Sequence, residues 1–419
     1  MTSIVESAGD SAAQTSKFSE RRQAIMRSAA LLFNERGIKG ATLADVAEAV
    51  ELNLKSLRYY FSRKNDLVAE CFLAAIDAYA QMIKVAEGGA TPRDRLGLYL
   101  DAYFGRRRRI VSGDEAPHLH FGGLRALDGE HLRRVSAAYV AMFADLSRLL
   151  GAQDGPAKRE GNSIAHLVLS QLLWAVVWTG RHEPERLARA SARMLDILIG
   201  GLAAPGVAWA PDHMDVSALA PASPEAPREA FLRAATKLIN EQGYRGASVE
   251  KISASLSVTK GSFYHHIDAK DDLVAQCFER TFDVMRQAKR VADTLGGSGF
   301  QRLVNATTLL VRFQFSEGGP LLRTAALSAV PREISYDLTR RMDRVTASFS
   351  DLISDGVIDG SIRPVDTNIG AQMITGMINA TEELWYWLPG VTADEAANAC
   401  ARRMFMGLFS EPEGRNGGR

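Results

Sequence analysis

The stretch Val258-Thr259-Lys260-Gly261-Ser262-Phe263-Tyr264-His265-His266, followed four residues later by Lys270, decides how the rest of the chain is interpreted. Its apolar residues recur at helical spacing and can anchor a short helix to a small core. Its polar side chains can reach phosphates or base edges, and Gly261 leaves room for close approach to a DNA backbone. Upstream, Ser248 can cap a second short helix over 249–256. Two short helices joined by a tight turn predict a helix-turn-helix unit.

The same pattern occurs earlier in the chain, 206 residues upstream and without a gap. Over the 51 positions from 22 to 72, 18 residues are identical to their counterparts from 228 to 278. In the first copy these are Arg22, Ala24, Arg27, Ala29, Leu32, Asn34, Glu35, Gly37, Gly40, Ala41, Ser56, Lys64, Asp66, Leu67, Val68, Ala69, Cys71 and Phe72. A repeat this long predicts two copies of one domain, because the periods of solenoid repeats are far shorter.

Both copies resemble the N-terminal DNA-binding domain of the TetR family of bacterial transcriptional regulators. That family's pattern joins an alanine-rich first helix, a Gly-x-x-Gly turn, a Thr or Ser cap and the run Val-Ser-x-Gly-x-x-Tyr-x-x-Phe-x-x-Lys. The second copy matches at Thr259, Gly261, Tyr264 and Lys270, with Ile267 where Phe is usual.

The first copy follows the family pattern less closely. Phe61 and Lys64 are present, but Lys55 replaces the glycine and Arg58 replaces the tyrosine. Outside the two matched segments, each half resembles the family only in its helical character. The resemblance implies an all-α chain made of two tandem units, each with a DNA-binding head and a helical body for ligand binding and dimerisation.

Composition and turn signals divide the chain into seven parts. They are a disordered arm (1–18), a first helix-turn-helix domain (19–65), a first body (66–203), a Pro-rich linker (204–224), a second helix-turn-helix domain (225–271), a second body (272–410) and a disordered tail (411–419). In the family, the last two helices of each body form a four-helix dimer interface. The resemblance therefore implies that residues 161–200 and 367–409 pack together as a pseudo-two-fold dimer within one chain.

Charge is distributed as DNA binding requires, although the whole chain carries only +1. Residues 21–64 contain nine Lys and Arg against four acids, and residues 227–270 contain seven against four. A local basic excess is the electrostatic footprint expected for a DNA-binding head. The predicted DNA-binding residues are Thr42, Lys55, Ser56, Arg58, Tyr59, Tyr60, Lys64, Ser248, Thr259, Lys260, Gly261, Ser262, Tyr264, His265, His266 and Lys270.

By resemblance, the tyrosines and the lysine that begins the long following helix hold phosphates, while positions 55–56 and 261–262 face bases. The two recognition segments differ at these positions, which predicts an asymmetric site or two unlike half-sites.

Aromatic and polar residues on the apolar body helices are candidates for a small-molecule site that would suit an apolar or aromatic effector. They are Tyr99, Tyr103, His118, Phe121, Trp174, Trp178, Phe313, Phe315 and Trp385. Core or interface packing explains each single residue at least equally well. Arg106–Arg109, four consecutive arginines, indicate either a contact with DNA or the head, or a solvated helix end.

Other chemistries find little support in the sequence. Cys71, Cys277 and Cys400 do not make a disulfide framework, and the matched pair Cys71 and Cys277 fits buried packing better than redox sensing. The run His118-Leu119-His120 is more typical of a solvated loop than of a metal site. Motifs for an enzyme or a cofactor are lacking, no apolar run reaches membrane-spanning length, and no signal peptide opens the chain, so a cytoplasmic protein is expected.

These observations predict a ligand-responsive transcriptional repressor with operator DNA and a small effector as partners. A DNA-binding regulator controlled by a protein partner is the first alternative. An interaction scaffold whose heads have lost DNA binding is the second.

Overall fold

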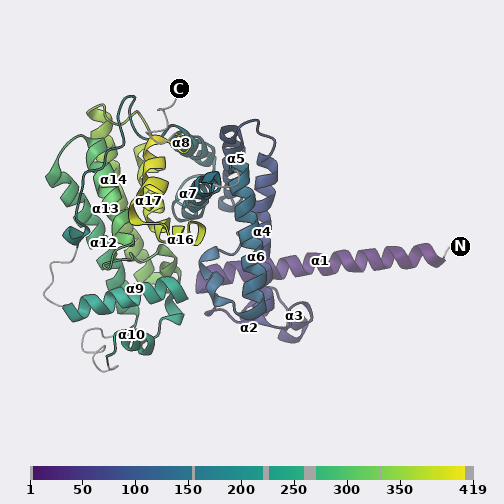
Figure 1. Ribbon diagram of the computed structural model, residues 1–419. Helices are drawn as coiled ribbons and strands as arrows, with labels where there is room; N and C mark the ends of the chain where they lie inside the picture. Colours follow the sequence, from purple (N-terminus) through teal and green to yellow (C-terminus); the bar gives the residue numbers. More distant parts are fainter. Residues whose placement is uncertain (1–2, 153–155, 220–225, 259–269, 331, 411–419) are drawn as a thin grey trace. The chain divides into compact units, whose positions relative to one another are not determined.

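The computed structural model describes residues 3–152, 156–219, 226–258, 270–330 and 332–410, and confirms the all-α class (Figure 1). Within these ranges β pairing is limited to one isolated antiparallel bridge between Ala203 and Ile362. The chain divides into two compact units. The first unit joins Met1–Gln81 to Gly113–Met142, and the second joins Met82–Ser112 to Phe143–Arg419.

The first unit contains the first helix-turn-helix head. Its helices are α1 (Ser3–Arg36), α2 (Leu43–Ala49), α3 (Leu54–Tyr60), most of α4 (Lys64–Ala86), η1 (Phe121–Ala126) and the start of α6 (Gly129–Leu149). Apolar residues at helical spacing on α1 are buried against α2 and the start of α4, and Leu57 fixes α3 to the same core. The head is thus held together by a small core, as the spacing of its apolar residues predicts.

Helix α1 begins at Ser3, so it includes residues 3–18 of the segment for which the sequence predicted a disordered arm. Residues 3–36 contain no proline, and their alanines and glutamates favour helix once the packed part of α1 supplies a nucleus. Phe18 stabilises this extension, because its ring stacks on Tyr60 at 4.9 Å and meets the edge of Tyr59 at 5.7 Å.

The second unit contains three complete α-helices of the first half, the ends of α4 and α6, and the described residues of the second half. Its elements in the first half are α5 (Pro92–Val111), α7 (Pro156–Thr179), η2 (Pro184–Arg186) and α8 (Leu187–Gly200). Those that follow are η3 (Val216–Leu219), α9 (Ala226–Gly246), α10 (Val249–Ser255), α12 (Lys270–Leu295), α13 (Gly299–Gln314), η4 (Thr324–Ala329), α14 (Arg332–Ile358), α15 (Thr367–Ala380), η5 (Thr381–Glu383), α16 (Leu384–Trp387), α17 (Ala393–Ala396), the π-helical turn η6 (Ala397–Arg402) and α18 (Arg403–Met406).

Within the second unit, the two halves of the chain pack on each other through their last helices. Helix α7 packs against α15 and α16, and α8 packs against α15 and α18. Gln171 Nε2 donates to the Met373 carbonyl (3.0 Å), and Trp174 Nε1 donates to Gln372 Oε1 (3.1 Å). Backbone bonds add to them, since Leu202 N donates to the Phe405 carbonyl at 2.7 Å.

The segment that the sequence assigned to a linker is bound to the second body over its described residues, 204–219. Asn305 on α13 accepts from the backbone N–H of Asp212 (3.0 Å) and donates to its carboxylate (2.7 Å). Trp209 packs on the Phe405 ring, and Leu219 is fully buried. The apolar side chains that lie among the prolines can be buried against the second body. A freely extended linker would have no such apolar surface to bury.

Helix α7 also has the length and composition of a membrane span, which differs from the expectation that no apolar run is long enough. Its best window lies within 157–179 and has a mean hydropathy of 1.2. Because 78% of that window is buried among other helices, the same properties are those of a core helix.

Candidate nucleic-acid interface

Helix α2 of the first head begins with a capping box. Asp45 N donates to Thr42 Oγ1 (3.2 Å), and Thr42 N donates to Asp45 Oδ2 (2.6 Å). The bonds from the Thr42 side chain and backbone hold the pKa of the exposed Asp45 carboxyl below its usual value. The Thr42 hydroxyl, a predicted DNA contact, is therefore engaged in starting α2.

Helix α3 presents the predicted recognition residues. Asn53 caps it by accepting from the Ser56 backbone N–H at 2.8 Å. Leu57 is fully buried, whereas Lys55, Arg58 and Tyr59 are exposed, Tyr59 by 76%. Neither cation forms an ion pair with any residue that the structure describes. We call Lys55, Arg58, Tyr59 and the half-buried Tyr60 the α3 face; it combines free positive charge with aromatic hydroxyls.

The start of α4, which carries Lys64, is fixed by Asp66. Its carboxylate accepts from the backbone N–H of Arg63 (2.8 Å) and the hydroxyl of Ser62 (2.9 Å), and it contacts His131 Nε2 at 2.9 Å. Burial acts to raise the pKa of Asp66, but these hydrogen bonds outweigh it and leave the pKa lowered. Lys64 is thereby held at the helix start, with its Nζ 5.9 Å from the centre of the Phe33 ring.

The two copies share their backbone turns as well as their residues. The Gly before α2 and its counterpart before α10 both have positive φ, as does the turn residue that follows each of these two helices. The matched pairs are Gly37 (71°) with Gly243 (72°), and Glu51 (54°) with Ser257 (57°). Ser248 caps α10 as Thr42 caps α2. The second copy therefore enters its recognition segment through the same turn geometry.

The second recognition segment itself lies outside the described residues. This applies to Thr259, Lys260, Gly261, Ser262, Tyr264, His265 and His266, and also to the side chain of Lys270, the first residue of α12. Their roles in DNA binding stay predictions that rest on the family resemblance.

Both halves share an asparagine that binds the head to a later loop. Asn34 binds the loop that follows α5, and its repeat partner Asn240 binds the loop that follows α13. Asn34 Nδ2 donates to the carbonyl of His118 (2.9 Å), and its Oδ1 accepts from His120 N (3.0 Å). Asn240 makes the same two bonds to Leu321 and Arg323, at 2.9 and 3.0 Å. The sequence showed the asparagine identity, but not this role, because the partners lie more than 80 residues away.

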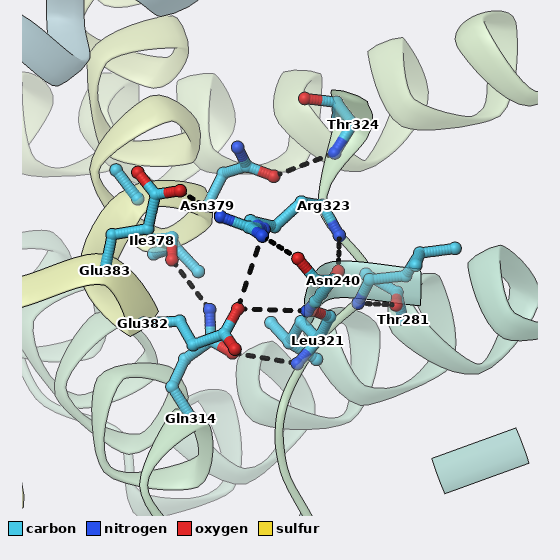
Figure 2. A network of polar contacts seen from close by, with 12 residues as sticks. Asn240, Thr281, Gln314, Leu321, Arg323, Thr324, Ile378, Asn379, Glu382 and Glu383 are labelled. Carbon is cyan, nitrogen blue, oxygen red and sulfur yellow. Dashed lines mark hydrogen bonds and ion pairs between the residues drawn. The ribbon is translucent and has the colours of Figure 1, made fainter. Parts of the chain in front are cut away.

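In the second half, further charged groups surround this amide (Figure 2). Asn240 Nδ2 also donates to Glu382 Oε2 at 3.0 Å. Arg323 donates to the Asn240 carbonyl and pairs with Glu383, and both glutamates belong to η5, directly after α15. The cluster thus connects α9, the first helix of the second head, to the end of a helix that packs against α7.

Replacing Asn240 with alanine is expected to lower the free energy of unfolding by about 2–3 kcal/mol, since it leaves a buried carbonyl and a buried N–H without a partner. Asn34→Ala removes the same two bonds from a half-buried site, where water can replace them, so a loss of about 1 kcal/mol or less is expected. Urea denaturation of both variants checks that Asn240→Ala loses more free energy of unfolding than Asn34→Ala. A larger loss for Asn34→Ala would contradict it.

The candidate ligand residues are distributed over both units. His118 and Phe121 lie in the first unit, where the Phe121 ring contacts Phe72, Tyr79 and Tyr139. The remaining candidates lie in the second unit and are Tyr99, Tyr103, Trp174, Trp178, Phe313, Phe315 and Trp385.

Two tryptophans among these candidates lie at a helix contact and at the surface. Trp174 is bonded across the contact between α7 and α15, and Trp385 is 50% exposed, stacked on Tyr386. By contrast, Tyr99, Tyr103 and Trp178 are almost fully buried. These three are the candidates that the structure keeps inside the first body.

All three cysteines are buried, as expected for the matched pair. Burial raises the pKa of the Cys71, Cys277 and Cys400 thiols to about 12. Cys71 Sγ and Cys277 Sγ donate to equivalent carbonyls, at 3.6 and 3.5 Å. Thiols protonated in this way are poor nucleophiles, so packing accounts for them.

Comparison with known proteins agrees with the repeat. Residues 25–71 and 231–277 each match the profile described as "Bacterial regulatory proteins, tetR family". The HTH-type transcriptional repressor DhaR of Mycobacterium sp. is 26% identical over 138 residues, which cover 32% of this chain and 70% of DhaR. The transposon Tn10 TetC protein of Escherichia coli is 36% identical over 52 residues, 12% of this chain and 26% of that protein.

Among solved structures, the TetR family transcriptional regulator PfmR from Thermus thermophilus is 20% identical, with a TM-score of 0.36. The alignment covers 42% of this chain and 98% of PfmR. The family match falls on both heads, on the residues that form their caps and turns. The chain therefore carries, in one polypeptide, two copies of the DNA-binding domain of the TetR family of bacterial regulatory proteins.

Proposed function

We propose that the protein is a cytoplasmic transcriptional repressor that binds an operator through both heads and leaves it when a small apolar or aromatic effector binds a body. The α3 face carries this proposal. Its two cations form no ion pair with the described residues, and together with two tyrosines they lie on the helix that a helix-turn-helix protein inserts into the major groove. The similarity to DhaR, named a repressor, supports the sign of control.

The operator is asymmetric under this proposal. Lys55 and Arg58 on α3 correspond to Gly261 and Tyr264 in the second copy, so the two heads offer different groups to base edges. In an ordinary two-fold dimer, identical heads read identical half-sites, whereas covalently joined heads are free to differ.

The contact between α7, α8 and α15 acts as the dimer interface of this single-chain regulator. The buried bonds of Gln171 and Trp174 support this role, as does the covalent link, which raises the effective concentration of one half for the other to about millimolar. Two heads must meet successive major grooves about 34 Å apart, so a small rotation of one half prevents both from fitting.

The polar cluster around Asn240 supplies a route for such a rotation in the second half. A shift at the end of α15 displaces Glu382 and Glu383, and these carboxylates are bonded to Asn240 and Arg323. The first helix of the second head would follow. Control by a protein partner in place of a small effector would use the same route.

An unbiased selection of bound DNA fragments tests the proposed function. We expect enriched sites with two unlike halves, about one or more helical turns apart, and a binding constant that falls steeply with salt. Two identical half-sites would contradict the asymmetric operator. Failure to enrich any sequence, with no salt-dependent binding, would favour the scaffold over the regulator.

A further inference from the structure

The four consecutive arginines at the end of α5 do not share one environment. Arg108 and Arg109 are exposed, but Arg107 is 92% buried, with a relative exposure of 8%. A solvated helix end, which the sequence offered as the alternative to a contact with DNA or with the head, does not describe a guanidinium in this position. Its burial therefore needs another explanation.

Arg107 has little to compensate its charge. Its Nε and one terminal nitrogen both donate to Thr179 Oγ1, at 3.2 and 3.0 Å. That hydroxyl itself donates to the carbonyl of Ala175. No carboxylate of the described residues pairs with Arg107. Three of its five N–H groups have no partner in the described chain, and its unbonded terminal nitrogen keeps some contact with solvent, since it is not among the buried atoms that lack a partner.

Two other buried arginines of this protein each form an ion pair with a carboxylate. Arg280, 5% exposed, pairs with Glu229 at 2.7 Å. Arg403, 8% exposed, pairs with Glu160 at 2.8 Å and donates to the Leu408 carbonyl. Leaving a charge unpaired inside a protein costs free energy. Unlike Arg280 and Arg403, Arg107 has no carboxylate partner among the described residues.

A second donor without a partner belongs to the residue before Thr179. Trp178, next to Thr179 in the chain, is 2% exposed, and its Nε1 has no hydrogen-bond partner among the described residues. The Trp178 ring is 6.3 Å from that of Phe104, one helical turn before Arg107 on α5. The residues next to Arg107 and Thr179 thus include an unbonded buried donor and aromatic rings, and no ion pair of Arg107 with a carboxylate occurs among the described residues.

The second half provides an internal comparison. Arg107 is the sixteenth residue after Thr91, the cap of α5, and Gln314 is the sixteenth after Ser298, the cap of α13. Gln314 is neutral and bonded at both ends: its Nε2 donates to the Ile378 carbonyl, and its Oε1 accepts from Leu321 N, each at 2.8 Å. The same position thus has a satisfied neutral amide in one half and an unpaired cation in the other.

We propose that the first body, and not the second, binds an apolar organic acid whose carboxylate pairs with Arg107 and Trp178 Nε1. A guanidinium offers two parallel N–H groups to a carboxylate, and the neighbouring rings of Phe104, Tyr103 and Trp178 receive the apolar part. The inference rests on the proposed function, for which it names the chemical class of the effector and the half that binds it.

Differential scanning fluorimetry and operator-binding anisotropy of the full chain test the inference with sodium octanoate, benzoate and 1-naphthoate, each beside its methyl ester. At least one acid is expected to raise Tm and release operator, while its ester does neither. Arg107→Gln introduces the residue found at this position in the second half. It is expected to weaken the binding of that acid about thirtyfold or more. Arg108→Gln, an exposed neighbour, is the matched control and should behave as wild type.

Stability without any acid separates a ligand site from a structural role. Arg107→Gln is expected to keep or raise the Tm of the free protein, because it removes an unpaired buried charge. A fall of more than about 5 °C would show that Arg107 supports the fold and would overturn the inference.

Three binding results would also overturn it: equal binding of acid and ester, unchanged acid binding by Arg107→Gln, or no binding of any of the three acids to the wild type. Release of operator by an ester alone would leave the proposed function intact while refuting this inference. Acid binding that never changes operator affinity would refute the effector part of the proposed function.

Discussion

Replacing Lys55 and Arg58 together with alanine is expected to weaken binding to the selected operator by about 100-fold or more. Both side chains are exposed on α3 and unpaired within the described chain, so they are available to phosphates and base edges. Each direct contact with a base contributes about 1–3 kcal/mol of discrimination, and each cation on a phosphate adds about one unit to the salt slope. Fluorescence anisotropy over a range of salt concentrations measures both effects.

The matched control removes the same charge elsewhere. Lys84 and Lys158 are exposed lysines outside the heads, and changing both to alanine lowers the net charge by the same two units. That variant should bind operator within about twofold of wild type, since charges beyond a Debye length of about 8–10 Å from the DNA are screened. Equal weakening by both double variants would mean that net charge, and not the α3 face, governs binding.

Capping and turn chemistry could be predicted from the sequence because it is local. Thr42 and Ser248 precede apolar periodic segments, and the structure places both as N-caps. Gly37 and Gly243 recur at equal positions, and both adopt the positive φ that glycine tolerates best. Each of these features depends on residues within a few positions of one another.

Features that depend on distant partners were missed. Asn240 bonds to a loop 81 residues later, and Asn305 holds Asp212, 93 residues earlier in the chain. Arg107 is buried and bonded to Thr179, the last residue of α7, although the two arginines that follow it in the sequence are exposed. A run of charges or prolines indicates solvent or flexibility until tertiary packing decides otherwise, and no periodicity reports that packing.

The substitution Gly376→Leu is expected to lower the free energy of unfolding by about 3 kcal/mol or more, by overpacking the contact between α7 and α15. A β-carbon at position 376 would lie 2.6 Å from Cγ of Trp174, which is closer than real β-carbons come to other atoms. The indole cannot yield easily, since its Nε1 is bonded to Gln372 and its ring is 96% buried. The smaller change Gly376→Ala should cost about 1–3 kcal/mol.

Gly105→Ala is the control for introducing a methyl group into a helix. Gly105 lies within α5, where a β-carbon would meet nothing within 4 Å. This change should stabilise the protein by up to about 1 kcal/mol, because alanine favours helix over glycine. If Gly105→Ala raises the free energy of unfolding and Gly376→Ala lowers it, the loss at position 376 comes from the close approach of the two helices and not from helix propensity.

The same variant distinguishes an interface within one chain from one between chains. If α7 and α15 pack within one polypeptide, wild type and Gly376→Leu both have a mass near 45.6 kDa by light scattering. The variant then loses only the fixed spacing of its heads. Its operator affinity falls toward that of a single head, by tenfold or more, and each tenfold corresponds to about 1.4 kcal/mol of binding free energy. A wild-type mass near twice 45.6 kDa that Gly376→Leu halves would instead place this contact between two chains.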